Sequence, residues 1–68
     1  MTILLNGEPR ELPPGTTVRT LLDELEVAGG ARGVAIAVDA AVVPRAEWET
    51  TRIDDGARVE VVRAIQGG

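Results

Sequence analysis

The sequence predicts an α+β fold in which one main helix packs on one face of a mixed sheet of four to five strands. Three features of the 68-residue chain carry this expectation. An Asn-Gly pair follows the first strand candidate and signals a tight hairpin. One amphipathic helical segment comes after the hairpin. Prolines accompany two of the strand candidates, which places those two strands at the edges of the sheet.

The first expected element is a hairpin. Residues 2–5 form an apolar strand candidate, and Asn6-Gly7 follows them directly. Both turn positions tolerate a positive φ, as a two-residue hairpin turn requires. The return strand is expected at residues 10–12, and Pro9 just before it cannot donate to a ladder of hydrogen bonds. The return strand should therefore lie at a sheet edge.

A helix of about ten residues is expected next, because apolar positions recur at helical spacing. These positions are Val18, Leu21, Leu22 and Leu25. Residues 13–15 precede the helix and fit a type II turn, with proline and glycine in its two central positions. Thr16 or Thr17 can serve as the N-cap, since a threonine hydroxyl accepts a hydrogen bond from a free amide of the first turn. Gly29 and Gly30 supply the expected end of the helix.

Residues 34–38 form a strand candidate whose two faces differ in size. One face carries the branched residues Val34, Ile36 and Val38. This larger face should meet the apolar stripe of the helix. Ala35 and Ala37 share the other face, which should be the back of the sheet.

The C-terminal half continues with a short strand, a helical turn and a last strand. The short strand is expected at residues 42–43, where Pro44 ends it and marks a second edge. Residues 45–48 have the pattern of a short helical turn, and residues 54–56 have the chemistry of a tight turn. Residues 58–65 contain no proline or glycine, so this last strand can lie in the centre of the sheet.

Both proline-marked strands fall at edges if the strand order is 2-1-5-3-4, with the first and last strands adjacent and parallel. One helix on one face of such a sheet is the β-grasp, or ubiquitin-like, architecture. The sequence shows no linker, internal repeat or low-complexity segment. We therefore expect a single domain over residues 1–68 that ends in a flexible tail at residues 66–68.

The composition excludes most catalytic chemistry. The chain contains no Cys, His, Tyr or Phe, and reading along it finds no Ser or Lys either. The usual general bases and nucleophiles are therefore missing. Zinc and other transition metals would find only carboxylates and backbone oxygens. These absences favour a binding or carrier protein, with no metal or cofactor of its own, over an enzyme.

Charge and hydropathy narrow the range of partners. The formal net charge of −4 argues against nucleic acid, which requires a basic surface. The longest apolar stretch, residues 33–43, is interrupted by Asp39 and is too short to cross a membrane. The absence of cysteine suits a reducing compartment, so we expect a cytoplasmic protein.

The C-terminal end, Gly67-Gly68, is the candidate reactive site. Glycine has no Cβ, so such an end can enter a narrow cleft and present its carboxylate to another enzyme. A frayed chain end is the alternative interpretation. Because the chain lacks the common nucleophiles, the carboxylate of Gly68 is the group on which chemistry is expected.

Six short segments together point to one family. They are Leu4-Leu5-Asn6-Gly7, Thr17-Val18 with Leu21-Leu22, Ala35-Ile36-Ala37-Val38, Val43-Pro44-Arg45 with Trp48, Asp55-Gly56, and Gln66-Gly67-Gly68. In these segments the chain resembles the ThiS family, the sulfur carrier proteins of thiamine biosynthesis, over essentially its whole length. The Val-Pro-Arg-x-x-Trp element combined with a terminal Gly-Gly is the most specific part of the resemblance.

The resemblance implies that partner enzymes perform the chemistry. In the family, an E1-like adenylyltransferase uses ATP and Mg²⁺ to form an acyl-adenylate at the terminal glycine, which is Gly68 here. Sulfur from a cysteine desulfurase or another donor then converts the adenylate to a thiocarboxylate. The thiocarboxylate delivers its sulfur to thiazole synthase. Gly67, which has no side chain, would allow the tail to enter the narrow cleft of the partner.

A docking surface for these partners is expected on the back of the sheet. The residues expected to form an apolar patch beside the tail are Leu4, Ala35, Ala37, Val62 and Ala64. Exposed apolar patches often mark protein interfaces, although ordinary apolar surface is the alternative. Gln66, next to the two glycines, and Arg45 are further candidate contacts.

Other conspicuous side chains have structural explanations. Trp48, the single aromatic residue, is expected to be a lid on the core rather than a contact residue. Arg45 fits a salt bridge within its loop and a partner contact equally well. Asp54-Asp55 is expected to be a solvated turn rather than a metal site, because adjacent carboxylates point apart.

Three alternative functions remain open at this stage. The chain also resembles the small subunit of molybdopterin synthase, another sulfur carrier that ends in Gly-Gly. A ubiquitin-like modifier, joined to target lysines through the same carboxylate, is the second alternative. The third is a β-grasp binding module whose tail does not react.

Overall fold

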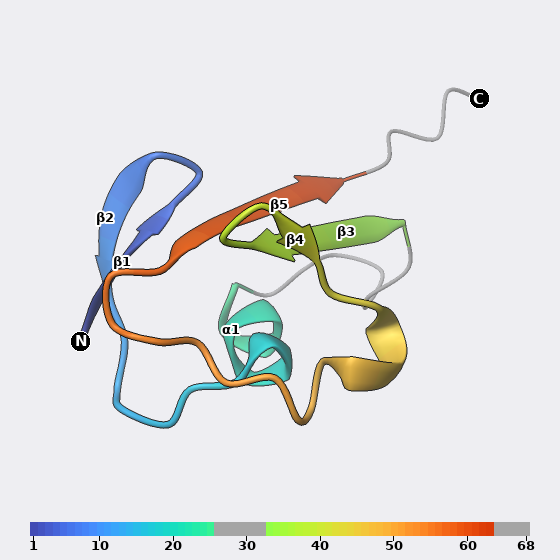
Figure 1. Cartoon of the computed structure of the whole chain (residues 1–68), viewed down its shortest axis with the longest axis horizontal. Coiled ribbons are helices and arrows are strands. Elements are labelled where there is room, and N and C mark those ends of the chain that lie inside the picture. The colour runs from blue at the N-terminus through green and yellow to red at the C-terminus, as the bar shows by residue number, and fades with distance from the viewer. Residues whose placement is uncertain (26–32, 64–68) are drawn as a thin grey trace.

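The computed structural model describes residues 1–25 and 33–63 of the chain, and Figure 1 shows the arrangement of its elements. The elements are, in chain order, β1 (Thr2–Leu5), β2 (Glu8–Glu11), α1 (Val18–Glu24), β3 (Val34–Val38), β4 (Ala41–Val42), the 3-10 helix η1 (Arg45–Glu47) and β5 (Arg58–Arg63). Helix α1 lies against one side of the sheet, and the segment that contains η1 passes beside it.

The five strands form one mixed sheet in the order β2-β1-β5-β3-β4. β1 and β5 are parallel, and the other neighbouring pairs are antiparallel. The strands accompanied by Pro9 and Pro44 are the two edges. The predicted fold class and strand order are therefore confirmed. β5 is described as far as Arg63, and residues 64–65 of the expected last strand lie outside the described residues.

The first hairpin has the predicted two-residue turn. Asn6 and Gly7 both adopt positive φ values, 50° and 84°. Leu5 lies opposite Glu8, so β2 begins directly after the turn and already contains Pro9. The expected return strand at residues 10–12 is corrected to Glu8–Glu11. An edge strand tolerates a proline inside it, because one side of the strand has no neighbour.

The fourth strand is one residue earlier than expected. It spans Ala41–Val42 rather than residues 42–43. Val43 leaves the strand and is buried in the core, although its amide still donates to the carbonyl oxygen of Ile36 at 2.9 Å. The paired part of β4 therefore ends at Val42, one residue before the expected end.

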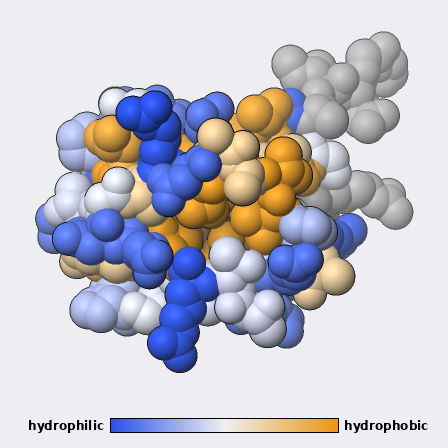
Figure 2. Space-filling view, in the orientation of Figure 1, coloured by the Kyte–Doolittle hydropathy of each residue, from blue (hydrophilic) through white to orange (hydrophobic). Residues whose placement is uncertain are grey.

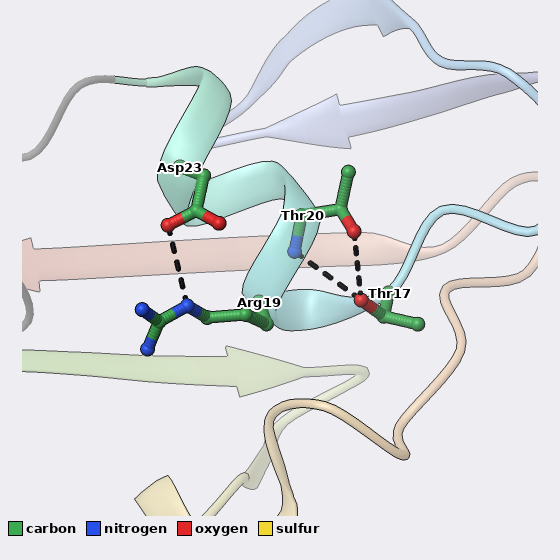
Figure 3. A network of polar contacts seen from close by, with 4 residues as sticks. All are labelled: Thr17, Arg19, Thr20 and Asp23. Atoms are coloured by element: carbon green, nitrogen blue, oxygen red, sulfur yellow. Dashed lines mark hydrogen bonds and ion pairs between the residues drawn. The ribbon is translucent and has the colours of Figure 1, made fainter.

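Figure 3 shows how the helix begins. Thr17 is the N-cap, and its Oγ1 accepts a hydrogen bond from the backbone amide of Thr20 at 3.2 Å. One turn further, the Nε atom of Arg19 lies 3.2 Å from a carboxylate oxygen of Asp23 on the exposed face. The choice left open between Thr16 and Thr17 is thereby settled for Thr17.

The loop that contains η1 completes the start of the helix. The amides of Val18 and Arg19 donate to the carbonyl oxygens of Thr51 and Trp48, at 2.9 and 3.0 Å. The first amides of a helix have no partner within the helix, so an external acceptor is needed wherever they are shielded from water. The loop therefore docks on the helix by hydrogen bonds as well as by packing.

The helix is shorter than the sequence pattern indicates. It spans Val18–Glu24, and Leu25 is its C-cap rather than an interior residue. Val18, Leu21 and Leu22 are buried as expected, whereas Leu25 is only partly buried. The expected stop at residues 29–30 lies outside the described residues.

The core fills the space between α1, the loop and one face of the sheet. Its buried members are Ile3, Leu12, Val18, Leu21, Leu22, Ile36, Val43, Trp48, Ile53, Ala57 and Val59. Val34, Val38 and Val61 pack against this cluster from the same face of the sheet. The predicted large face of residues 34–38 therefore meets the helix. Within residues 1–25 and 33–63, no helix has the length and apolar character needed to cross a membrane.

Candidate functional site

The back face, the face of the sheet turned away from α1, carries most of the predicted contact residues that the structure describes. Leu4 and Val62 are exposed, with 37% and 60% of their surface accessible. Ala35 is exposed and Ala37 is half-buried. Val42 on the edge strand is 73% exposed. It was not among the predicted contact residues, although the expected short strand included it.

The strand register places the exposed apolar residues of the back face in two separate regions. Ala35 lies opposite Val62, and Ala37 lies opposite Val42 on β4, so these four share one end of the back face. Leu4 pairs with Arg58 instead. Arg58 and Val62 are separated along β5 by about 13 Å, at roughly 3.3 Å per residue. Figure 2, in the orientation of Figure 1, shows hydrophobic side chains near β4 and between the strands and α1, with hydrophilic groups around them.

The surface around Leu4 is a shallow depression with charged walls. Its volume is about 520 Å³, and it is lined by Leu4, Asn6, Gly7, Arg58 and Glu60. An adjoining depression of about 370 Å³ extends it toward the turn between β3 and β4. An arginine and a glutamate side by side provide no net charge for recognising an ion.

Asn6 has a role that sequence reasoning missed. Its side-chain Oδ1 accepts from the amide of Val61 at 2.9 Å, and its Nδ2 donates to the carbonyl oxygen of Val61 at 3.3 Å. An asparagine at the first position of the turn was expected only for its positive φ. The parallel pairing of the first and last strands was the one signal that could have placed its side chain beside β5.

Asp39 makes a comparable contact at the other end of β5. Its Oδ1 accepts from the amide of Arg58 at 2.9 Å, while its own amide donates to the Arg58 carbonyl oxygen at 2.8 Å. Asp39 and Ala40 form the turn between β3 and β4 with φ values of 49° and 70°. Two hairpin turns thus each direct one side chain to the backbone of the central strand.

Arg45 stacks on Trp48 rather than forming a salt bridge. The Cζ atom of Arg45 lies 5.9 Å from the centre of the Trp48 ring, within the range of a cation–π contact. The ion pairs found among the described residues do not involve Arg45. Trp48 is buried, and its Nε1 donates to the Val43 carbonyl oxygen at 2.9 Å. The interpretation of Trp48 as a core lid is confirmed, whereas a partner contact for Arg45 stays a prediction.

Asp54 and Asp55 belong to a tight turn. The amide of Ala57 donates to the Asp54 carbonyl oxygen at 3.1 Å, and Asp55 Oδ1 accepts from the amide of Thr2 at 2.9 Å. One carboxylate is therefore used to attach the turn to β1. Across residues 1–25 and 33–63, acidic side chains do not gather into a group of three that could hold a metal ion.

The predicted reactive end lies outside the described residues. This applies to Ala64, Gln66, Gly67 and Gly68. The assignment of chemistry to Gly68 and of access to Gly67 stays a prediction. The structure contributes the geometry of the strand that leads to them, which is described as far as Arg63.

Comparison with known proteins gives matches along the whole chain. The family model described as ThiS family matches residues 3–68. A curated protein named sulfur carrier protein ThiS, from Escherichia coli K12, is 32% identical over 68 residues, which is 100% of each chain. A thiazole synthase from Paramagnetospirillum magneticum is 35% identical over the same 68 residues. The present chain spans only 20% of that longer protein.

Solved structures agree with the sequence matches. A crystal structure of the thiamine biosynthesis protein ThiS from Geobacter metallireducens superposes with a TM-score of 0.85 at 30% identity, covering 100% of both chains. The solution structure of a thiamine biosynthesis protein from that organism gives 0.82, covering 100% of this chain and 88% of the other. The sequence, the fold and the extent of these matches show that the chain belongs to the ThiS family.

Proposed function

We propose that this chain carries sulfur as a thiocarboxylate on Gly68 and delivers it for formation of the thiazole ring of thiamine. Membership of the ThiS family makes the chain a sulfur carrier protein of thiamine biosynthesis and not itself an enzyme. The observation that carries the proposal is the match to the E. coli sulfur carrier protein, which covers 100% of both chains.

The proposed chemistry begins with activation of the terminal carboxylate. A C-terminal carboxylate is ionised at neutral pH and, as an anion, resists attack by a sulfur nucleophile. We propose that a partner adenylyltransferase, using ATP and Mg²⁺, joins a Gly68 oxygen to the α-phosphate with release of pyrophosphate. A sulfur nucleophile, supplied from a cysteine desulfurase or another donor, then attacks the Gly68 carbonyl carbon and AMP leaves. If the nucleophile is sulfide, this step gives the thiocarboxylate directly. If it is a persulfide, the product is an acyl disulfide, and a second thiol must cleave its S–S bond, forming a disulfide with the donor and leaving the thiocarboxylate on Gly68.

Thiazole synthase is the proposed recipient of the sulfur. A stretch similar to the whole of this chain forms part of the Paramagnetospirillum protein that bears that name. Residence of carrier-like and thiazole synthase sequences in one chain supports a functional pairing of the two. The adenylyltransferase and the sulfur donor are proposed from the chemistry that the carrier requires.

The proposed docking surface is the exposed apolar end of the back face. Ala35, Ala37 and Val62 were predicted for it, and Val42 joins them in the structure. Val62 stands next to Arg63, the last described residue of β5, so this surface adjoins the strand that leads to the tail. Leu4 and Arg45 are proposed as outlying contacts, and Ala64 and Gln66 remain candidates on the tail itself.

Intact-mass measurement tests the proposal. The chain, incubated with its cognate adenylyltransferase, ATP and a sulfur donor, should gain the mass difference between one sulfur and one oxygen atom. Removal of residues 67–68 should abolish the gain and produce thiamine auxotrophy in the host. An unchanged mass in the presence of an active partner would refute the proposal. High-mass conjugates would indicate a protein modifier, and restored molybdopterin synthesis rather than thiamine synthesis would indicate the other carrier pathway.

A further inference from the structure

The central strand extends beyond its parallel neighbour. β1 ends at Leu5, which lies opposite Val59, whereas β5 continues to Arg63. On its other side β5 stays paired with β3 up to the contact between Arg63 and Val34. Beyond Val59, β5 therefore has β3 as a neighbour on one side but no strand neighbour on the other, because β1 has ended.

The side chain of Asn6 takes the place of the missing strand. The Asn6 amide makes the last backbone contact of the ladder, to the Val59 carbonyl oxygen at 2.8 Å. The next donor and acceptor along β5 belong to Val61, and both bind the Asn6 carboxamide, at 2.9 and 3.3 Å. A carboxamide offers the same donor and acceptor pair as a peptide group. The ladder thus continues for one more step without a further residue of β1.

We propose that Asn6 is a positioning residue for the reaction at the C-terminus. By holding Val61, it restrains the side of β5 that has passed the end of β1, two residues before the last described residue of the strand. This restraint limits how the carboxylate of Gly68 can approach the partner's active site. The proposal rests on the proposed function, because it assumes that the carboxylate of Gly68 reacts in a partner enzyme. Accurate alignment of reacting groups is a large contribution to the rate of such reactions.

The turn favours an asparagine at this position but does not require one. Glycine satisfies a φ of 50° at this position without strain, so Asn6→Gly preserves the turn while removing the contact with Val61. Asp39 provides a matched control. It has a φ of 49° and holds Arg58, at the opposite end of the same strand. Asp39→Gly therefore removes a similar contact at the end of β5 that is remote from the tail.

The experiment compares the whole chain and the two glycine variants by backbone hydrogen exchange and by pyrophosphate exchange with the cognate adenylyltransferase. Asn6→Gly should speed amide exchange at Val61 by about tenfold or more, since the amide loses its acceptor. Its kcat should fall about tenfold through poorer alignment. Its KM should stay within about twofold, since docking is unchanged. Asp39→Gly should speed exchange at Arg58 and leave both kinetic constants within about twofold.

A third variant separates hydrogen bonding from turn formation. Asn6→Asp keeps an acceptor for the Val61 amide but places a carboxylate oxygen against the Val61 carbonyl oxygen. It should therefore behave like Asn6→Gly in kcat rather than like the unmodified chain. Thermal melts of all three variants verify that each is folded at the assay temperature.

Each outcome has one interpretation. A normal kcat for Asn6→Gly, or an equal loss in Asp39→Gly, overturns the positioning role while the proposed function stands. An unchanged rate of amide hydrogen exchange at Val61 in Asn6→Gly also overturns the positioning role, since the Asn6 side chain then does not restrain Val61. Absence of pyrophosphate exchange by the unmodified chain refutes the proposed function and the positioning role together.

Discussion

The two faces of the sheet are built from the same strands but differ in what surrounds them. On β5, Val59 is fully buried against the helix, whereas Val62 keeps 60% of its surface exposed. On β3, Ile36 is buried and its neighbour Ala35 is exposed. The alternation of side chains along a strand produces this contrast over three residues or fewer. The helix-facing side therefore contributes most of the buried apolar surface that stabilises the domain, and the back face remains exposed for contact with partners.

The two faces also differ in charge. On the helix-facing side of the central strands, Ile3, Ile36 and Val59 are apolar and belong to the core cluster. The back face instead places Arg58 and Glu60 beside Leu4. Charged side chains remain hydrated on an exposed face and cost little there, whereas they would destabilise the core. Substitutions on the two faces should therefore have opposite consequences for stability and for binding.

The largest expected effect comes from a charge on the buried face. Val59→Asp places an unpaired carboxylate among Leu5, Val38 and the rest of the core, where it has no hydrogen-bonding partner. The loss should exceed about 4 kcal/mol. A domain of this size has a total stability of about 3–10 kcal/mol. The variant should be unfolded by circular dichroism at 25 °C, and a cooperative melt near that of the unmodified chain would show that the face is less enclosed than described.

A cavity under the helix should have the next largest effect. Leu21 is fully buried in the middle of α1. Leu21→Ala should lower the free energy of unfolding by about 2–5 kcal/mol, since the removed methyl groups leave a void. Chemical denaturation measures the loss. A change below about 1 kcal/mol would mean that the core relaxes to fill the space.

The same substitution at the end of the helix should cost less. Leu25, the last residue of the predicted apolar stripe, is the C-cap and is only partly buried. Leu25→Ala should therefore lower the free energy of unfolding by about 1–2 kcal/mol, in proportion to the smaller apolar area removed from water. Denaturation of the two leucine variants side by side checks the order. An equal loss would place Leu25 in the core after all.

Much of the fold could be predicted because local signals agreed with the global arrangement. Asn6-Gly7 identified the turn, and two prolines identified the edges, which together left few possible strand orders. The alternation in residues 34–38 identified the two faces of the sheet. Element ends were less certain, because they depend on tertiary contacts. Val43 was expected in the short strand but lies just after β4, although its amide still donates to the carbonyl oxygen of Ile36.

The contacts that hold β5 could not be predicted from local signals. Asn6 and Val61 are 55 positions apart in the sequence, so their contact follows only from the strand register. Ala40 adopts a φ of 70°, a conformation that its side chain disfavours and that no propensity scale would assign to alanine. The candidate contact surface was predicted in outline, but the separation of Leu4 from Val62 depends on which residues of β5 face each neighbour.

The smallest expected effect on stability comes from a charge on the back face. Val62→Asp should change the free energy of unfolding by no more than about 0.5 kcal/mol, because an exposed carboxylate stays hydrated. The same variant should weaken binding to the cognate adenylyltransferase by about tenfold or more, since a charge in an apolar interface loses its water without gaining a partner. Calorimetric titration measures the dissociation constant, and a thermal melt measures stability.

Thr50→Asp is the matched control for this variant. Thr50 is exposed on the loop after η1, so the substitution adds the same charge away from the back face. Weaker binding by Val62→Asp alone assigns the interface to the back face. Equal weakening by both variants would attribute the effect to net charge instead, since a more acidic chain is repelled by an acidic partner at any position. Because Val59→Asp and Val62→Asp differ by three positions on one strand, a folded and binding-defective Val62→Asp beside an unfolded Val59→Asp separates the two faces by function.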